Sequence, residues 1–241
     1  MTEKEEIERT ESVIEAKNKG GNREHKSDVF SMLMEDPWNA LDVYNALNGS
    51  SYEDPAMVEI LQLDHGISLS MRNDAAFIID CQLNIYEHQS TWNPNMPLRG
   101  VYYYAILYRR YEKKHNLNVY GSAPLKLPMP VYVVFCNSVD MTEARVELRL
   151  TDLFPDNGRE SACLECIAHV ININRGYNDD IVNGCQRLYE YVQCIETIRS
   201  FSYGISSKDS ARLSERIEQA IDVCIEKGYL ADILEEERSA A

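Results

Sequence analysis

Two carboxylates and an amide flank a short polar turn between two apolar runs. Asp74 precedes the first run, and Glu87 and Gln89 end the second. If residues 80–83 form the turn of a β-hairpin, Asp74 lies opposite Gln89 and Ala76 lies opposite Glu87. Strand side chains alternate between two faces, so Asp74, Glu87 and Gln89 are expected on one face of a sheet. Oxygen ligands of this kind suit Mg²⁺.

The surrounding sequence resembles a known nuclease family. An Asp that opens one strand and a Glu-x-Lys or Glu-x-Gln in the next is the signature of PD-(D/E)XK nucleases. Over roughly residues 25–230 the chain is similar to the bacterial Rpn family, named for recombination-promoting nucleases and transposase-like proteins. The segments that carry the resemblance are YNALNG (44–49), RND (72–74), YEHQST (86–91), NPNMPLR (93–99) and VININ (170–174).

This resemblance implies a fold and an activity. The expected fold is α/β, with a PD-(D/E)XK restriction-endonuclease-like core of order α-β-β-β-α-β, a mixed sheet flanked by helices, and a C-terminal helical extension. The expected activity is metal-dependent cleavage of DNA, linked to recombination, transposase-like mobility or defence. Asp74, Glu87 and Gln89 would be catalytic, and Asp74 and Glu87 would bind Mg²⁺ or Mn²⁺.

Two positions depart from the usual pattern. Most PD-(D/E)XK enzymes have Lys at the position of Gln89, and an amide can orient water but carries no charge and cannot shuttle a proton. Slow catalysis or none is therefore compatible with the sequence. A further metal ligand from the preceding helix is expected at Asp28, in preference to Glu35 or Asp36. The family usually has Lys-Asp-Ser before Val-Phe, whereas this chain has Lys-Ser-Asp.

Charge distribution indicates where nucleic acid would bind. The chain has a net charge of −15, which argues against a surface that is cationic throughout. Between residues 99 and 114, however, five cations face a single acid, Glu112. This segment is either a DNA-contacting surface or the solvated basic face of a helix. The candidate DNA-binding residues are Arg99, Arg109, Arg110, Lys113 and Lys114.

Hydrophobic periodicity predicts the elements that would position these residues. Residues 28–48 are predicted to be helical in two pieces around Pro37. The helix predicted at residues 98–115 has an apolar-aromatic stripe of Val101, Tyr104, Ala105, Tyr108 and Tyr111. The remaining predicted strands are 58–63, 67–71, 75–79, 83–89, 131–135, 145–150 and 163–173, and the remaining predicted helices are 179–201 and 210–225.

Other chemistry receives less support from the sequence. Cys163-x-x-Cys166-x-x-His169 offers zinc ligands, but residues three apart in a strand point to opposite faces. His88 should face away from Glu87 and is expected to be a packed histidine. No nucleotide-binding glycine loop or nucleophile elbow is present. A non-catalytic protein that keeps the fold for interaction or assembly is the alternative to the endonuclease.

The expected organisation is a flexible charged arm (1–24), a nuclease-like domain (25–204) and a C-terminal helical segment (205–241). An apolar stripe in this segment must be buried, either by packing back on the nuclease core or by pairing with a second copy, and a homodimer is expected. The stripe consists of Leu213, Ile217, Ala220, Ile221, Cys224 and Ile225. Seven scattered cysteines favour free thiols over disulfides. No apolar run reaches the ~18 residues of a membrane span, so a cytoplasmic protein is expected.

Overall fold

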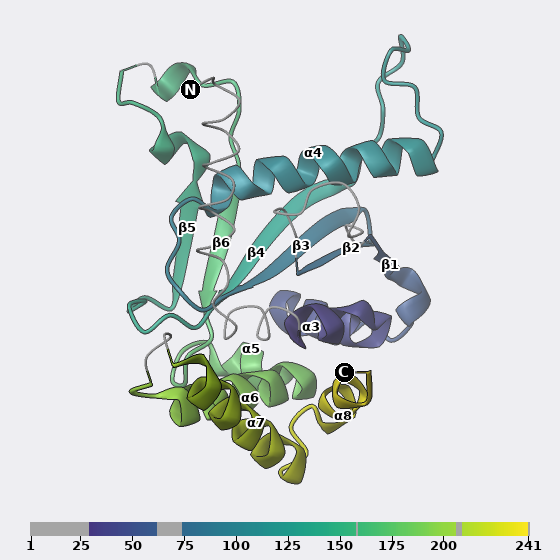
Figure 1. Ribbon diagram of the computed structural model, residues 1–241. Helices are drawn as coiled ribbons and strands as arrows, with labels where there is room; N and C mark the ends of the chain where they lie inside the picture. The colour runs from purple at the N-terminus through teal and green to yellow at the C-terminus, as the bar shows by residue number, and fades with distance from the viewer. Residues whose placement is uncertain (1–28, 62–73, 158, 206–208, 241) are drawn as a thin grey trace, which may run out of the picture. The chain divides into compact units, whose positions relative to one another are not determined.

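The computed structural model describes residues 29–61, 74–157, 159–205 and 209–240 (Figure 1). Residues 30–192 form one compact unit, and residue 29 with residues 193 onward belongs to a second. The expected arm at 1–24, the metal ligand Asp28 and the strand at 67–71 lie outside the described residues. The unit of residues 30–192 contains the sheet and the candidate site.

The first unit is built on a six-stranded mixed sheet of order β1-β2-β3-β4-β6-β5. Strands β1, β2 and β3 pair antiparallel, β4 and β6 continue parallel to β3, and β5 is an antiparallel edge strand. β4 is central and buried from Tyr132 onward, as expected for a continuous apolar run. The strands are β1 (Glu59–Ile60), β2 (Ala75–Ile79), β3 (Gln82–Gln89), β4 (Met129–Cys136), β5 (Arg145–Arg149) and β6 (Ile167–Asn172).

The β2–β3 hairpin closes more tightly than its sequence predicts. Asp80 and Cys81 alone form the turn, with φ of 45° and 65°, so both adopt the left-handed conformation of a type I′ turn. Ile79 therefore pairs with Gln82, and Ala76 pairs with Ile85 instead of Glu87. The predicted four-residue turn and its register are wrong by two residues. Continued by one pair, the observed register sets Asp74 opposite Glu87.

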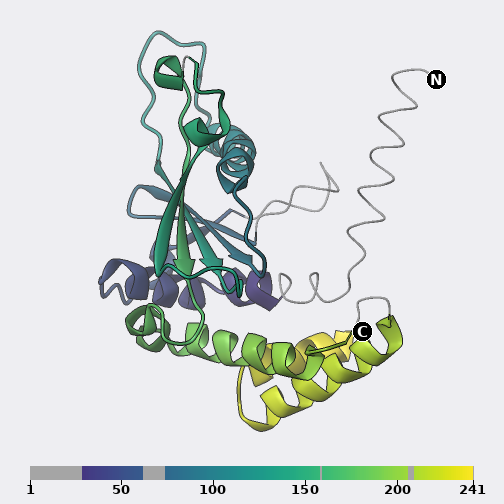
Figure 2. The same cartoon turned by 90° about the vertical axis from the view of Figure 1, so that its left-hand side faces the viewer.

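Helices α3 (Pro37–Asn48) and α4 (Met96–Lys114) lie on opposite sides of the sheet (Figure 1). Residues 29–35 are also helical, and Asp36 caps the N-terminus of α3, which confirms two helical pieces around Pro37. Figure 2 shows α4 end-on against one face of the sheet. Between β3 and β4, α4 forms the crossover that two parallel strands require.

The face of α4 that meets the sheet differs from the predicted stripe. Tyr103 and Leu107 are buried in the core, whereas Ala105 is exposed and Val101, Tyr104, Tyr108 and Tyr111 are half-buried. Gly100 explains the difference, because a Cβ there would lie 2.8 Å from the Tyr132 ring and 2.9 Å from Cys166 Sγ. Without a side chain at this position, the helix approaches the sheet closely along the line of Gly100 and Tyr103.

The remaining elements of this unit are short or lead into the second unit. The helix predicted over 179–201 is two helices separated at Cys185, which has an extended conformation. The strand predicted at 163–173 begins only at Ile167. These elements are the 3₁₀ turns Pro55–Met57, Leu150–Leu153 and Arg159–Ser161, and the helices α5 (Asp179–Gly184) and α6 (Gln186–Ser202), the last of which continues into the second unit.

The described C-terminal part of the second unit is helical. It contains the end of α6, α7 (Ser210–Glu226) and α8 (Ala231–Ala240). On α7, Ile217, Ala220 and Cys224 are buried, and Cys224 Sγ lies 4.0 Å from the carbonyl oxygen of Cys194 on α6. No helix in the described part of the chain is both long and apolar enough to cross a membrane.

Candidate active site

Glu87 is the centre of the candidate site. It projects from β3 on the face covered by α4 and is 1% exposed. Its Oε1 accepts a hydrogen bond from Arg99 Nη2 at 3.0 Å, which is also an ion pair. Its Oε2 accepts from the hydroxyl of Tyr132 on β4. Both carboxylate oxygens therefore have a donor from the protein.

The electrostatic state of Glu87 reflects opposing effects. Burial raises the pKa of Glu87 above its ordinary value, while the charge of Arg99 and hydrogen bonds from Tyr132 and Tyr103 oppose the rise. Burial and the nearby Glu87 carboxylate raise the pKa of Tyr132 well above 10, so this hydroxyl keeps its proton and remains a donor. The site is thus a buried carboxylate stabilised by one cation and by phenol groups.

Arg99 reaches Glu87 because α4 is placed closely on the sheet. It lies in the first turn of the helix, beside Gly100, whose missing side chain permits the close approach. Tyr103, one turn later, accepts hydrogen bonds from Arg99 Nε at 3.1 Å and Nη2 at 2.6 Å. The Arg99 side chain is 35% exposed, so it stands between the buried Glu87 and solvent.

Asp74 directly precedes β2 and is buried. Its Oδ2 accepts a hydrogen bond of 2.7 Å from the backbone N–H of His88. This contact holds the Asp74 carboxylate against β3 at the residue after Glu87. Strand alternation from Ala76 assigns Asp74 to the same face of the sheet as Glu87.

His88 occupies the opposite face of β3, as its position in the strand predicts. Its Nε2 lies 3.1 Å from Asn137 Oδ1, and its ring packs against Phe30 and Tyr191. This is a packed, hydrogen-bonded histidine. Gln89 ends β3 and is half-buried, on the same face as Glu87 by alternation.

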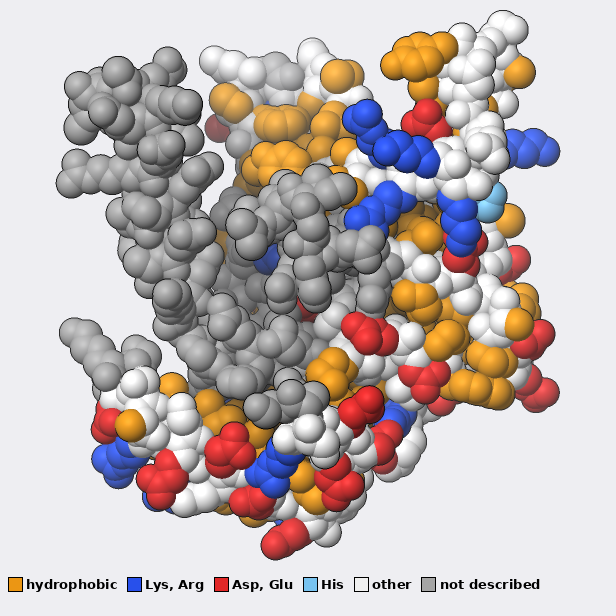
Figure 3. Space-filling view, turned by 45° about the vertical axis from the view of Figure 1, so that its right-hand side comes forward, with side chains coloured by type: hydrophobic (Ala, Val, Ile, Leu, Met, Phe, Trp, Pro, Cys, Tyr) orange, Lys and Arg blue, Asp and Glu red, His pale blue; other side chains and the backbone are white. Residues whose placement is uncertain are grey.

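The five candidate DNA-binding cations fall into different environments. Arg99 is engaged by Glu87, and Lys114 Nζ lies 2.6 Å from Glu59 Oε1 of β1. Arg109 and Lys113 are exposed on α4, and Arg110 is half-buried. Figure 3 shows Lys and Arg side chains gathered near the C-terminal half of α4, with carboxylates close by. The exposed cations are thus separated along the helix from Arg99.

Tyr103 and Tyr132 are site residues that the sequence interpretation missed. Tyr132 belongs to the apolar run of β4, where it is the residue with a polar end among Val and Phe. A buried tyrosine hydroxyl usually needs a hydrogen-bond partner, and that requirement was the available signal. Neither residue could be assigned to Glu87 without knowing which strands are neighbours.

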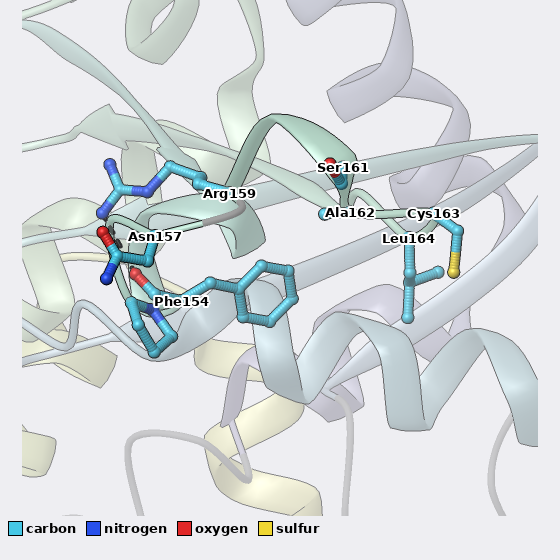
Figure 4. A pocket seen from close by; sticks show the side chains of 8 residues that line it. Phe154, Asn157, Arg159, Ser161, Ala162, Cys163 and Leu164 are labelled. Carbon is cyan, nitrogen blue, oxygen red and sulfur yellow. Dashed lines mark hydrogen bonds between the residues drawn. The ribbon is translucent and has the colours of Figure 1, made fainter.

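The zinc interpretation gains no support from the geometry. Cys163 is exposed and Cys166 is buried against Gly100 of α4. Cys163 instead lines a hollow of about 350 Å³ formed by the segment that connects β5 to β6. Figure 4 shows Phe154, Asn157 and Arg159 on one side of it and residues 161–164 on the other. This hollow shares no residue with the group of Asp74, Glu87 and Arg99.

The donor set can be tested against a hard cation. Within residues 29–61, 74–157, 159–205 and 209–240, no group of three or more His, Cys, Asp or Glu side chains is placed to hold a metal. Asp74 and Glu87 nevertheless contribute two carboxylates, and Mg²⁺ is commonly held by one or two carboxylates with water and phosphate oxygens completing its shell. Oxygen donors of this type fit Mg²⁺ or Mn²⁺.

Comparisons with protein-family models, with curated proteins and with solved structures found no match for this chain. The fold and site together define a mixed α/β protein with a six-stranded mixed sheet flanked by helices. One face of this sheet holds a buried carboxylate paired with a half-buried guanidinium, and a second buried acid precedes the neighbouring strand.

Proposed function

We propose that the protein is a metal-dependent DNA endonuclease with a PD-(D/E)XK-like core. The observation that carries the proposal is the placement of two buried acids at opposite positions of the β2–β3 hairpin, one of which is paired with a cation. Asp74 precedes β2, Glu87 lies on β3, and Arg99 from α4 reaches Glu87. Two acids near a cationic, phosphate-binding type of side chain suit phosphodiester hydrolysis.

The order of elements supports the same proposal. Along the chain, α3, β1, β2, β3, α4 and β4 follow the α-β-β-β-α-β order that the Rpn resemblance implies. The three strands of the meander are antiparallel, and β4 runs parallel to β3. In this arrangement Glu87 lies on the inner strand β3, and Asp74 directly precedes the inner strand β2. The resemblance links such a nuclease to recombination, transposase-like mobility or defence.

Each residue has a distinct part in the proposed reaction. Asp74 and Glu87 would hold Mg²⁺ or Mn²⁺, which supplies an activated water and neutralises charge on the phosphate. The half-buried Gln89 orients the attacking water through its amide. Arg99 binds a non-bridging phosphate oxygen, and the exposed Arg109 and Lys113 contact the DNA backbone further along α4.

The contacts of Glu87 also favour a second candidate function. Because Arg99 and Tyr132 satisfy both oxygens, the pair can serve as a structural link between α4 and the sheet. A protein that keeps the fold without catalysis and acts in interaction or assembly would need no more than this. Gln89 in place of the usual Lys is compatible with that alternative.

A metal titration separates the two functions. Supercoiled plasmid is incubated with the purified protein over a range of Mg²⁺ and Mn²⁺ concentrations, with EDTA as the control. The endonuclease proposal predicts nicked or linear products in the presence of Mg²⁺ or Mn²⁺ and none in the presence of EDTA. Absence of cleavage with both metals would support the non-catalytic alternative.

We also propose that the protein assembles as a homodimer through its C-terminal helices. On α7, Leu213, Ile221 and Ile225 remain partly exposed beside the buried part of the stripe. A second copy would cover these apolar side chains and place two nicking sites in one assembly. Light scattering of the full chain at micromolar concentration tests the proposal, and a monomeric mass would reject it.

A further inference from the structure

We infer that Arg99 couples phosphate binding to metal binding by exchanging the Glu87 carboxylate for a phosphodiester oxygen. The inference rests on the proposed endonuclease function and concerns how its site is loaded. In the unliganded protein, Arg99 is paired with the Glu87 carboxylate. When the DNA backbone is present, Arg99 turns to the phosphate, and Glu87 becomes available to the metal ion.

The contacts of Glu87 give the first reason. A guanidinium nitrogen lies 3.0 Å from Oε1, and Tyr132 donates to Oε2. A divalent cation that approaches Glu87 is therefore repelled by the Arg99 guanidinium, which already lies at hydrogen-bond distance from the carboxylate. The repulsion is strong because charges are poorly screened in a buried setting. Metal binding is weak for as long as Arg99 keeps this position.

The exposure of the two side chains gives the second reason. Glu87 is 1% exposed, whereas the side chain of Arg99 is 35% exposed. An anion that arrives from solvent thus meets Arg99 first. The planar guanidinium presents several N–H donors in a fork that matches phosphate oxygens as well as carboxylate oxygens. The exchange replaces one acceptor by another of the same charge.

Tyr103 gives the third reason. Its hydroxyl accepts from both Nε and Nη2 of Arg99, so the guanidinium stays at the site when its contact with Glu87 is released. Gly100 fixes the first turn of α4 against Tyr132, so the helix itself has little room to move. The exchange is therefore a reorientation of one side chain about a fixed support.

Coupling of this kind is reciprocal. If a phosphodiester strengthens metal binding by a given factor, the metal strengthens phosphodiester binding by the same factor. A protein loaded in this way would hold its metal firmly only when DNA is present, which limits unproductive metal binding.

The test is calorimetric titration of the full chain with Mn²⁺ near pH 8, with and without excess dimethyl phosphate as a stable phosphodiester. Arg99→Met should bind Mn²⁺ on the order of ten-fold more tightly than the wild type. A neighbouring Arg lowers the affinity of a carboxylate for a proton by about ten-fold or more, and its positive charge opposes the binding of a divalent cation in the same way. Arg109→Met is the control, because it removes an equal charge from the exposed face of α4. It should change affinity by less than about two-fold.

Dimethyl phosphate should strengthen Mn²⁺ binding by the wild type and have little effect on Arg99→Met. Circular dichroism checks folding, and Arg99→Gln, which keeps a donor for Glu87 without the charge, provides a second variant with the same expected direction. Equal Mn²⁺ affinity in the wild type and both Arg99 variants, with binding still lost in Asp74→Ala, would overturn the proposed coupling. The assignment of the metal site itself would then still stand. Absence of any Mn²⁺ binding that depends on Asp74 or Glu87 would overturn the proposed function as well.

Discussion

Arg99 Nη2 lies 3.0 Å from Glu87 Oε1, although one residue comes from the first turn of α4 and the other from the end of β3. The contact joins helix and sheet at one point, together with the hydroxyls of Tyr103 and Tyr132. The stability of this point depends on the Glu87 carboxylate having these partners, whereas the proposed chemistry requires Arg99 to release it.

The hydroxyl of Tyr132 should contribute measurably to stability. In Tyr132→Phe, Glu87 Oε2 loses its donor while remaining buried, and a buried acceptor without a partner costs about 1–3 kcal/mol. Urea unfolding monitored by circular dichroism measures the loss. The matched control is Tyr102→Phe on α4, where the side chain is 45% exposed and the expected change is within about 0.5 kcal/mol. Equal effects of the two substitutions would contradict the assigned role of Tyr132.

Gly100 should tolerate no side chain, despite its position inside a helix. An added Cβ would meet the Tyr132 ring at 2.8 Å, so Gly100→Ala is expected to destabilise the protein by about 1–3 kcal/mol. Gly184→Ala in α5 is the control, because its Cβ would meet Ala46 at an ordinary 3.7 Å. There the gain in helix propensity should leave stability unchanged or slightly increased. A stabilising Gly100→Ala would show that α4 does not approach the sheet this closely.

Cysteine reactivity should follow burial and pH. Burial raises the pKa of Cys166 to about 11, so roughly one thiol in a thousand is thiolate at pH 8, and the thiolate is the reactive form. Native alkylation at this pH should therefore modify the exposed Cys81 and Cys163 and spare Cys166. Mass spectrometry after proteolysis identifies the sites, with protein unfolded in urea as the control.

The raised pKa of Cys166 also makes the stability of the protein depend on pH. Because the folded pKa of Cys166 lies above the unfolded value of about 8.5, the stability contributed by this thiol is fully present below pH 8.5. It is lost as the pH rises toward 11. Cys166→Ala should lack this part of the alkaline decline, and an unchanged decline in that variant would argue against the assignment.

Gln89 provides a test of the chemistry at the third site position. Gln89→Lys introduces the positive charge that most PD-(D/E)XK enzymes have there, so metal-dependent plasmid cleavage should be retained or increased. Gln82→Lys, at the other end of β3, is the matched control and should leave cleavage unchanged. Loss of cleavage in Gln89→Lys alone would contradict the assigned role of residue 89.

Local patterns predicted the positions of most described strands, but they predicted the bounds of β1 and β6 and the hairpin register poorly. The apolar run 75–79 predicted β2 with its observed bounds. The turn was not predictable, because Asp80 and Cys81 both have positive φ without a glycine, a conformation that most side chains disfavour. The site could be proposed from the types and spacing of Asp74, Glu87 and Gln89. The pairing of Asp74, however, depends on a two-residue turn that the sequence pattern does not predict.

The partners of Glu87 depend on tertiary structure. Several faces of α4 are apolar or aromatic, so periodicity alone cannot choose which one is buried. Gly100 makes that choice by allowing close approach, and thereby brings Arg99 to Glu87. Tyr132 joins them because β4 lies beside β3 in the sheet. The two strands are separated in the sequence by the whole of α4, so local patterns could not predict this pairing.

The most direct test of the central claim is cleavage of supercoiled plasmid by the wild type, Asp74→Ala and Glu87→Ala in Mg²⁺ and in Mn²⁺. The control is Glu147→Ala, which removes an exposed acid from the edge strand β5. We predict cleavage by the wild type and the control, and its loss in both site variants while their circular dichroism spectra stay native. Cleavage that persists in a folded Glu87→Ala protein, or that is absent from the wild type with either metal, would contradict the assignment of Asp74 and Glu87 as the catalytic acids.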